Sequence, residues 1–355
     1  MIENIKTLSA AERMAYSLRG LFERYGYTQY RMSKFEEYDL YVRNKSFLLS
    51  NQIITFTDTD GKLMALKPDV TLSIVKNSPE EECGVRKLYY NENVYRVPKG
   101  SFSYKEIMQA GVECIGELDS YSVSEVLTLA AKGLSLISDD FVLDVSDLGI
   151  ISEVVDSMGL DRCGRERVFT AIGEKNVQGI AAVLNEYGVA SEKSDTLCSL
   201  VSMNGDADEM LKILDGASYA CEFAKIIGVL RDKFGDRVRI DFSVVDDMRY
   251  YNGIVFKGFI KGIPTSVLSG GRYDSLMSLM GKKSGAIGFA VYLDLLDELD
   301  EDDSEYDCDI FLLYKENTPI GDIAKKADEL TLCGKRVRCG MTMPSGVSFK
   351  ETVEI

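Results

Sequence analysis

The spacing of the apolar residues changes twice along this chain of 355 residues, and that change constrains the fold more than any other feature. Several strand-like runs lie before residue 150. From about residue 150 to 233 the apolar residues recur at helical intervals, with breaks at Gly159, Gly188 and Gly205. Strand-like runs return at 237–245, 251–260 and 264–269. We therefore predict an α+β fold in which a helical insertion interrupts a domain built on a sheet.

The charge pattern adds a further boundary near the carboxyl end. Eight acids within residues 297–307 mark a solvated linker. Beyond it, a strand at 308–314, a helix starting at Thr318-Pro319 and a strand at 335–339 predict a small βαβ-type appendage. The predicted segments are a first part of the core at 1–149, the helical insertion at 150–233, a second part of the core at 234–300, and the linker with a small α/β segment at 301–355.

Local signals predict individual elements of the core. Ser9 and Glu12 have capping-box spacing at the start of a helix over residues 9–25. A hairpin is predicted to turn at Asp60-Gly61. Two further predictions are a short helix at 69–77 and a buried helix at 285–299.

One predicted strand, at 104–116, carries a candidate site. Because side chains alternate across a strand, its even-numbered apolar residues share one face and its polar residues share the other. The apolar face holds Met108, Ala110, Val112 and Cys114, and the other holds Gln109, Gly111 and Glu113. Gly111 has no side chain, so it could leave a floor on which a ligand lies. The alternative is an ordinary solvent-exposed face of an antiparallel sheet.

Composition limits the chemistry that the chain can perform. Histidine is absent, which removes the commonest general base and the commonest nitrogen ligand of metals, and we expect no metal and no cofactor. A net charge of −16 disfavours nucleic acid as a partner. The eight cysteines lack CxxC spacing and are predicted to be reduced thiols. With no long apolar run and an acidic amino terminus, we expect a cytoplasmic location and no membrane partner.

Taken singly, the remaining motifs are weak evidence for a functional site. The glycine pair Gly270-Gly271 allows close approach of a ligand to the backbone, yet such a pair is usually a turn. The stretch 248–253 could be a site or a hairpin with aromatic packing. Asp69 is most simply explained as an acid near the amino-terminal end of a helix. No phosphate-binding loop, dinucleotide fingerprint or activated nucleophile is present in the sequence.

In order, however, these segments resemble class II aminoacyl-tRNA synthetases, and within them the histidyl branch. The resemblance covers about residues 10–300 and implies an antiparallel sheet flanked by helices. The segments that resemble family motifs are 22–36, TFTDTDGKLMALKPDVT, LYYNENVYR through EIMQAGVECIG, RYYNGIVF, SGGRYD and AIGFAVYLDLL.

The resemblance implies a histidine site, residue by residue. Asp69, Thr71, Gln109 and Glu113 match positions that hold the amino group and imidazole of histidine. Arg96 matches an arginine that contacts the carboxylate and the α-phosphate. The residues that match the walls of the histidine pocket are Tyr250, Tyr251 and Tyr273, and Gly270 and Gly271 belong to the same predicted ligand-binding set.

Several departures from the family pattern concern the nucleotide. Leu295 stands where the third motif has an arginine that grips the triphosphate, and Tyr292 replaces a glycine that makes room for adenine. Pro98 replaces an acid that contacts adenine, and Asp246 replaces an arginine that supports adenylate formation. Losing charge-assisted contacts to phosphate costs several kcal/mol of transition-state stabilisation, so we expect no aminoacylation.

Such a pattern resembles the paralogous regulatory subunits of ATP phosphoribosyltransferase. The resemblance implies a non-catalytic subunit in histidine biosynthesis, needed for the activity of a short catalytic subunit and for feedback inhibition by histidine. It also implies a homodimer within a hetero-oligomer, in which histidine binds either in the synthetase-like pocket or at a subunit junction. The alternatives are an active histidyl-tRNA synthetase and a degenerate amino-acid-binding paralogue of it.

Overall fold

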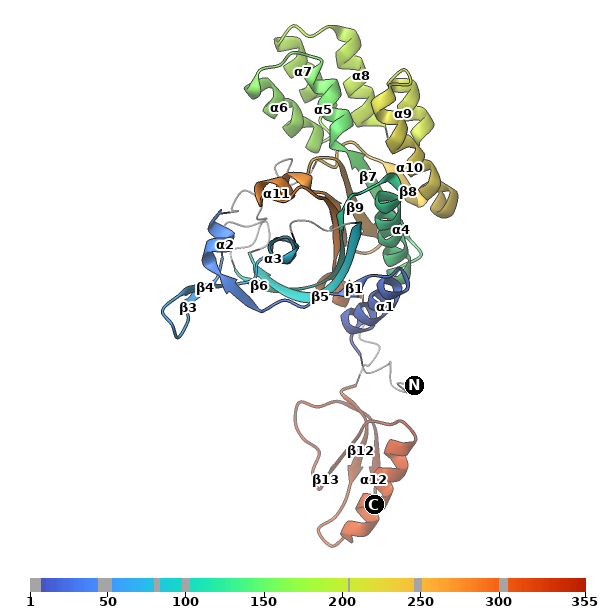
Figure 1. Cartoon of the computed structure of the whole chain (residues 1–355). Helices are drawn as coiled ribbons and strands as arrows, with labels where there is room; N and C mark the ends of the chain where they lie inside the picture. Colours follow the sequence, from blue (N-terminus) through green and yellow to red (C-terminus); the bar gives the residue numbers. More distant parts are fainter. Residues whose placement is uncertain are drawn as a thin grey trace. The chain divides into compact units, whose positions relative to one another are not determined.

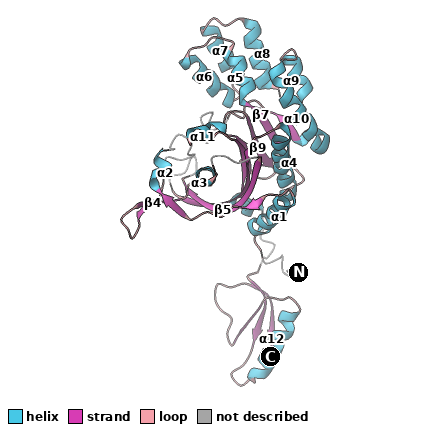
Figure 2. Cartoon of the chain, viewed as in Figure 1, coloured by secondary structure: helices cyan, strands magenta, loops and turns pink. Residues whose placement is uncertain are grey.

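The computed structural model describes residues 8–43, 53–79, 84–97, 103–203, 205–245, 251–299 and 306–355. The chain divides into two compact units, Met1–Leu299 and Asp300–Ile355. No sheet is shared between the two units among the residues that the structure describes, and each unit is described by itself. Figure 2 distinguishes the helices from the strands of the chain.

An eight-stranded sheet forms the centre of the first unit, in the order β1-β5-β6-β11-β10-β9-β7-β8. Its interior pairs are antiparallel, whereas the edge pairs β1–β5 and β7–β8 are parallel. The strands are β1 (Thr28–Gln29), β5 (Val85–Arg96), β6 (Lys105–Gly116), β7 (Phe141–Asp147), β8 (Val238–Ile240), β9 (Ile254–Ile260), β10 (Leu268–Arg272) and β11 (Gly285–Tyr292).

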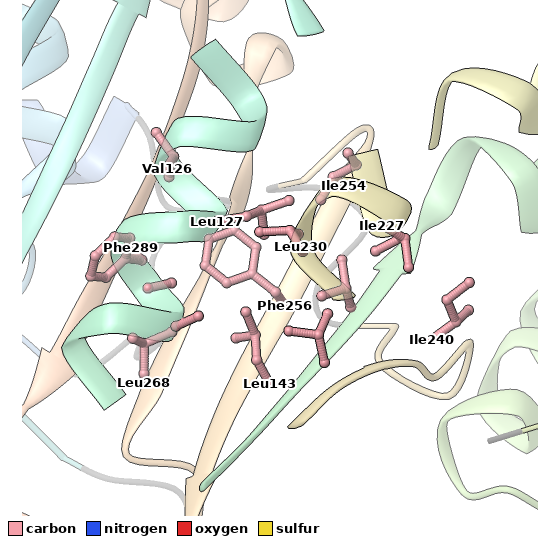
Figure 3. Packing of buried hydrophobic residues seen from close by; sticks show 14 of the residues in the cluster. Val126, Leu127, Leu143, Ile227, Leu230, Ile240, Ile254, Phe256, Leu268 and Phe289 are labelled. Carbon is pink, nitrogen blue, oxygen red and sulfur yellow. The ribbon is translucent and has the colours of Figure 1, made fainter. Parts of the chain in front are cut away.

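Two helices cover one face of this sheet, α1 (Ala10–Arg24) and α4 (Ser120–Ile137). The capping box of α1 is present, because the Ser9 hydroxyl accepts from the Glu12 amide and the Glu12 carboxylate accepts from the Ser9 amide. Figure 3 shows the packing between α4 and the strands, with Phe256 of β9 beside Leu127 of α4. Met108, Ala110, Val112 and Cys114 of β6 face this core, as the alternation predicts.

The other face of the sheet is also covered. Helices α3 (Thr71–Asn77) and α11 (Asp274–Leu279) lie on it, and α3 sits inside the curve of the sheet (Figure 1). Tyr90 and Ile107 of the sheet pack there in a second apolar cluster with Leu72 and Leu276 of the helices. The alternative of a solvent-exposed sheet face is therefore wrong, and the polar side chains on this face are enclosed by protein.

A small antiparallel sheet accompanies α3. Its order is β2-β4-β3, and β3 and β4 form the predicted hairpin, with Gly61 at a φ of 80°. The elements are β2 (Phe35–Glu37), α2 (Tyr38–Arg43), β3 (Thr55–Thr57) and β4 (Leu63–Leu66).

Helices fill the segment between β7 and β8, where helical spacing predicts an insertion. Their buried residues, such as Ile172, Leu200 and Ile227, belong to the same core as the sheet. The helices are α5 (Leu148–Asp156), α6 (Arg162–Gly173), α7 (Val177–Glu186), α8 (Ser191–Ser202), α9 (Ala207–Ile213), α10 (Ser218–Phe234) and the short 3-10 helix η3 (Gly235–Arg237).

The second unit contains a three-stranded parallel sheet and one helix. The sheet order is β13-β12-β14. The elements are β12 (Cys308–Leu313), α12 (Ile320–Leu332), β13 (Val337–Gly340) and β14 (Phe349–Glu354). Pro319, rather than Thr318, is the cap residue of α12, and the Thr318 hydroxyl accepts from the Lys315 amide at 3.1 Å instead.

Three predictions about the second part of the core are wrong. Residues 285–299 form β11 and the 3-10 helix η4 (Leu293–Leu299), not a buried helix. The pair Gly270-Gly271 lies inside β10 and not in a turn. The strand predicted at 237–245 ends at Ile240, because the Asp241 carboxylate accepts from the Ser243 amide at 2.9 Å and turns the chain.

Candidate functional site

Glu113 of β6 is the centre of a polar cluster on the face of the sheet covered by α3. Its side chain is 2 % exposed. The Thr71 hydroxyl donates to Glu113 Oε1 at 2.7 Å, and the Tyr273 hydroxyl donates to Oε2. Burial raises the pKa of the Glu113 carboxyl to about 8, against the lowering effect of the two hydroxyl donors. We call Asp69, Thr71, Tyr90, Glu113 and Tyr273 the Glu113 cluster.

Asp69 adds a second carboxylate to the cluster. Its Oδ1 accepts from the Leu72 amide at 2.8 Å, so it holds the first turn of α3 as the helix-entry interpretation predicts. Asp69 keeps part of its surface exposed, yet burial still raises the pKa of its carboxyl, and Arg96 partly opposes that rise. Both Asp69 and Thr71 reach the cluster because α3 begins beside β6.

Glycine in the neighbouring strand makes room for the Glu113 carboxyl. Gly288 of β11 pairs with Glu113, and a Cβ at Gly288 would lie 1.8 Å from Glu113 Oε2. Gly271 of β10 pairs with Gly288 and lies under the ring of Tyr251, whose Cδ1 would be 2.6 Å from a Cβ there. These glycines therefore act by allowing side chains to lie flat on the strands.

Tyr90 is a member of the cluster that the sequence reasoning missed. It pairs with Gly111 across β5 and β6, and its hydroxyl would lie 2.6 Å from a Cβ at Gly111. Burial, with Glu113 and Asp69 nearby, raises the pKa of the Tyr90 phenol well above its usual range. The space beside Gly111 is thus filled by Tyr90, which corrects the prediction of an empty floor. The parity of LYYNENVYR against the next strand could have identified it.

Arg96 and Gln109 lie beside the cluster, together with Tyr292. Arg96 is 9 % exposed, and its guanidinium stacks over the Tyr292 ring at 6.0 Å from the ring centroid. The Tyr292 hydroxyl is 2.6 Å from the Ser269 hydroxyl. Gln109 is 5 % exposed and pairs with Tyr292 across β6 and β11. The sequence predicts that Tyr292 fills space, and the structure adds Arg96 as its partner.

A buried ion pair that the sequence analysis did not identify lies next to this group. The Lys67 ammonium donates to the Glu92 carboxylate, and the side chain of Lys67 is 2 % exposed. Glu92 of β5 pairs with Gln109 of β6 in the register of these two strands. The Lys67 carbonyl also accepts from the Tyr95 amide at 2.9 Å. The pair therefore fixes the segment that leads to Asp69 against β5.

Not every predicted site residue joins the cluster. Gly270 lies on the opposite face, where a Cβ would meet Phe289 and Phe256 of the apolar core, so parity removes it from the ligand-binding set. Tyr251 lies at the cluster through its contact with Gly271. The predictions for Tyr250, Asp246 and Pro98 fall on residues outside the described ranges.

The ranges that the structure describes contain no group of three or more Cys, Asp or Glu residues that could hold a metal ion. In the same ranges no helix is both long enough and apolar enough to cross a membrane.

The sheet, its covering helices and the buried polar cluster define a fold like that of class II synthetases, and the predicted α+β architecture is confirmed. The sequence profile of histidyl-tRNA synthetase matches residues 5–296. The chain therefore belongs to the histidyl-tRNA synthetase family, as the resemblance indicates.

Individual relatives in this family carry two kinds of name. An ATP phosphoribosyltransferase regulatory subunit from a Thermoanaerobacter species is 29% identical over 317 residues, which are 84% of this chain and 82% of the relative. A histidine–tRNA ligase from Methanocaldococcus jannaschii is 26% identical over 356 residues, 95% of this chain and 85% of the relative.

A crystal structure from Bacillus halodurans, titled as an ATP phosphoribosyltransferase regulatory subunit/histidyl-tRNA synthetase, has the same fold. Its TM-score is 0.75 at 23% identity, covering 97% of this chain and 93% of that one.

Proposed function

We propose that this chain is a regulatory, non-catalytic subunit of ATP phosphoribosyltransferase in histidine biosynthesis. It would be needed for the activity of the short catalytic subunit and for feedback inhibition by histidine. Relatives of that name at 25–29% identity support the proposal. The observation that carries it is the contrast between an intact polar cluster around Glu113 and a neighbouring space filled by Tyr292 and Arg96.

The Glu113 cluster suits a small ligand with basic nitrogens. The site holds two carboxyl groups, Asp69 and Glu113; burial and, to a smaller extent, the charge of Asp69 raise the pKa of Glu113, and hydroxyls from Thr71 and Tyr273 orient the Glu113 carboxyl. Asp69 and Tyr251 keep part of their surface exposed, which gives a ligand a way in. Histidine offers an ammonium and an imidazole to the carboxyl groups, and the guanidinium of Arg96 lies beside the cluster to meet its carboxylate.

The neighbouring space suits a nucleotide poorly. Arg96 stacks on Tyr292, and the Tyr292 hydroxyl is hydrogen-bonded to the Ser269 hydroxyl. The Tyr292 ring and the Arg96 guanidinium are therefore already in contact with groups of this chain. Leu295, which replaces the arginine of the third motif, packs against the apolar core. Without bidentate arginine contacts to the triphosphate, several kcal/mol of transition-state stabilisation are lost. This loss supports the non-catalytic part of the proposal.

In the proposed assembly, the chain forms a homodimer through α1 and binds the catalytic subunits on other surfaces. Tyr16 of α1 is 60% exposed and offers a large aromatic contact to a second copy. Histidine would inhibit by binding better to an inactive arrangement of the complex, with a coupling of about 1–3 kcal/mol. Nucleic acid is not a partner in this proposal, since the net charge is −16.

Histidine-dependent exchange between ATP and pyrophosphate tests the non-catalytic part of the proposal. We expect the purified chain to show no exchange above background, with an active histidyl-tRNA synthetase as the positive control. A robust rate would instead support the second candidate function, that of a histidyl-tRNA synthetase. The observation in favour of this candidate is the similarity to the ligase from Methanocaldococcus jannaschii, which extends over 95% of this chain.

A further inference from the structure

We infer that strand β3 is an interface between two copies of this chain, in which each β3 pairs with the β3 of the other copy in an antiparallel ladder. This contact is separate from the α1 dimer and is independent of the proposed function. Three features of β3 lead to it: the exposure of its outer edge, the direction of its backbone groups, and the aromatic side chains beside it.

Strand β3 lies at the edge of the small sheet, in a hairpin that projects from the rest of the first unit (Figure 1). Its residues Thr55, Phe56 and Thr57 are all exposed. Within the described ranges no further strand pairs with the outer side of β3. The backbone groups on that side therefore face solvent, and an exposed edge of this kind is a template for another strand.

The other edge strands of the described sheets are protected against such pairing. An isolated bridge from Gly205 covers part of β8, and β1 has only two residues. The edge strands β2, β13 and β14 carry charged residues such as Glu37, Arg338 and Lys350. Shortness, cover and charge are the means by which proteins prevent contact between edges. Residues 53–57, by contrast, contain no charge and no proline.

The ladder with β4 determines where the backbone groups of β3 point. In an antiparallel ladder, hydrogen-bonded pairs of residues alternate with non-hydrogen-bonded pairs. The Ile54 carbonyl accepts from the Leu66 amide at 3.0 Å, and the Asp58 amide donates across the same hairpin at 2.9 Å. The even-numbered residues of β3 therefore bond within the hairpin. The N–H and C=O groups of Thr55 and Thr57 point away from β4.

These outward groups are complementary to the same groups of a second copy. When two β3 strands run antiparallel about a two-fold axis at Phe56, Thr55 of each copy lies opposite Thr57 of the other. Each such pair exchanges two N–H···O=C bonds, so every outward donor meets an acceptor. The same register places the Asp58 carboxylate opposite Ile54 and not opposite a second carboxylate. Because the edge is complementary to itself, the occupant is a second copy.

Aromatic side chains add an apolar contact at the axis. The Phe56 ring is 37% exposed and lies 5.4 Å from the Phe35 ring of β2, at an angle of 87°. Phe35 is itself 45% exposed. In the proposed register the two copies of Phe56 form a non-hydrogen-bonded pair, with Cα atoms about 4.5 Å apart and side chains on the same face. The rings of both copies therefore join in one apolar cluster.

Disulfide trapping of the purified chain tests the register directly. In Phe56→Cys the new thiols of two copies lie across the axis, at a separation that suits a disulfide. Under mild oxidation we expect a covalent dimer to form at least about tenfold faster than in the control Leu63→Cys. Leu63 is similarly exposed, at 48%, but lies on the central strand β4. Mass spectrometry should find the bond between positions 56 of two chains, and wild type reports the background from native cysteines.

Thr55→Pro tests the backbone pairing without disturbing the hairpin. The proline ring replaces an outward N–H, so the bonds between β3 and β4 are kept. We expect analytical ultracentrifugation to show about half as many chains per particle as in wild type, because the pairing of copies is lost. The matched control Thr55→Val keeps both the N–H and the β-branched side chain and should match wild type. Circular dichroism verifies that both variants are folded.

A rate of disulfide formation in Phe56→Cys no greater than that in Leu63→Cys would overturn this inference. A disulfide from position 56 to another position of the same chain would also overturn it, because the edge would then be occupied within the chain. A folded Thr55→Pro variant with the same number of chains per particle as wild type would contradict the pairing of β3 as well.

Discussion

At Glu113, burial makes the free energy of unfolding depend on pH. The folded carboxyl has a pKa of about 8, and a glutamate in the unfolded chain has one of about 4.3. Between these two pH values the folded protein binds one more proton at Glu113 than the unfolded chain does. The contribution of Glu113 to the free energy of unfolding is therefore greatest below about pH 4.3 and is lost as pH rises through about 8. We expect Glu113→Gln to remove this fall. Relative to wild type, its free energy of unfolding should rise by a few kcal/mol between pH 5 and pH 9, as measured by urea denaturation.

Glu117→Gln provides the matched control, because Glu117 lies just beyond the same strand and is exposed. Its substitution should leave the pH profile of wild type unchanged. Parallel profiles for Glu113→Gln and wild type would mean that Glu113 is ionised in the folded protein at neutral pH.

Gly288 is the residue whose lack of a side chain shapes the cluster. A Cβ there would meet Glu113 Oε2 at 1.8 Å and the Val112 carbonyl oxygen at 2.4 Å, and the carbonyl cannot move aside easily. We expect Gly288→Ala to lower the free energy of unfolding by about 1–3 kcal/mol and to weaken histidine binding, measured by urea denaturation and calorimetry. The control Gly228→Ala lies in helix α10 with nothing within 4 Å, and should stabilise by about 0.5–1 kcal/mol. Equal effects of the two substitutions would contradict the close packing at Gly288.

Among the elements, strand β5 and the segment before α3 are joined by the buried pair of Lys67 and Glu92. Glu92→Gln leaves the Lys67 ammonium buried without its counter-charge and should cost about 3–5 kcal/mol in urea denaturation. Adding Lys67→Met should restore most of that loss. The exposed pair of Lys62 and Glu37 is the control, and Glu37→Gln should cost less than about 1 kcal/mol. A small effect of Glu92→Gln would mean that the pair does not fix the segment leading to Asp69.

The elements also show how far sequence reasoning reaches. Alternation along 104–116 places Glu113 and Gln109 on one face, because the side-chain period of a strand is fixed by its backbone. The same reasoning fails for 285–292, since β11 lies inside the sheet and is covered on both faces. Its run of apolar residues therefore lacks the alternation of a half-buried strand, and its pattern resembles that of a buried helix.

Residues far apart in sequence set the part of the site that the sequence did not reveal. That Tyr90 lies over Gly111 follows from the register of β5 and β6, and that Gly270 faces the core follows from the register of β10. The pairing of Lys67 with Glu92 depends on how the small sheet meets the large one. Such contacts require the sheet order, which local patterns do not specify.

For the whole molecule, we propose that an amino-acid site remains while the nucleotide contacts have been replaced by contacts within the chain. Family membership over residues 5–296 is common to active synthetases and to regulatory subunits, so it does not separate the two functions. In the proposed function, Leu295 at the position of the third-motif arginine and the stack of Arg96 on Tyr292 separate them.

The measurement that tests this claim most directly is the rate of phosphoribosyl-ATP formation by a short-form catalytic subunit mixed with this chain. We expect the chain to raise the rate well above that of the catalytic subunit alone, and L-histidine to lower the raised rate. Glu113→Gln should keep the stimulation and lose most of the inhibition by histidine, which separates assembly from ligand sensing. A rate that does not change when the chain is added would contradict the regulatory function.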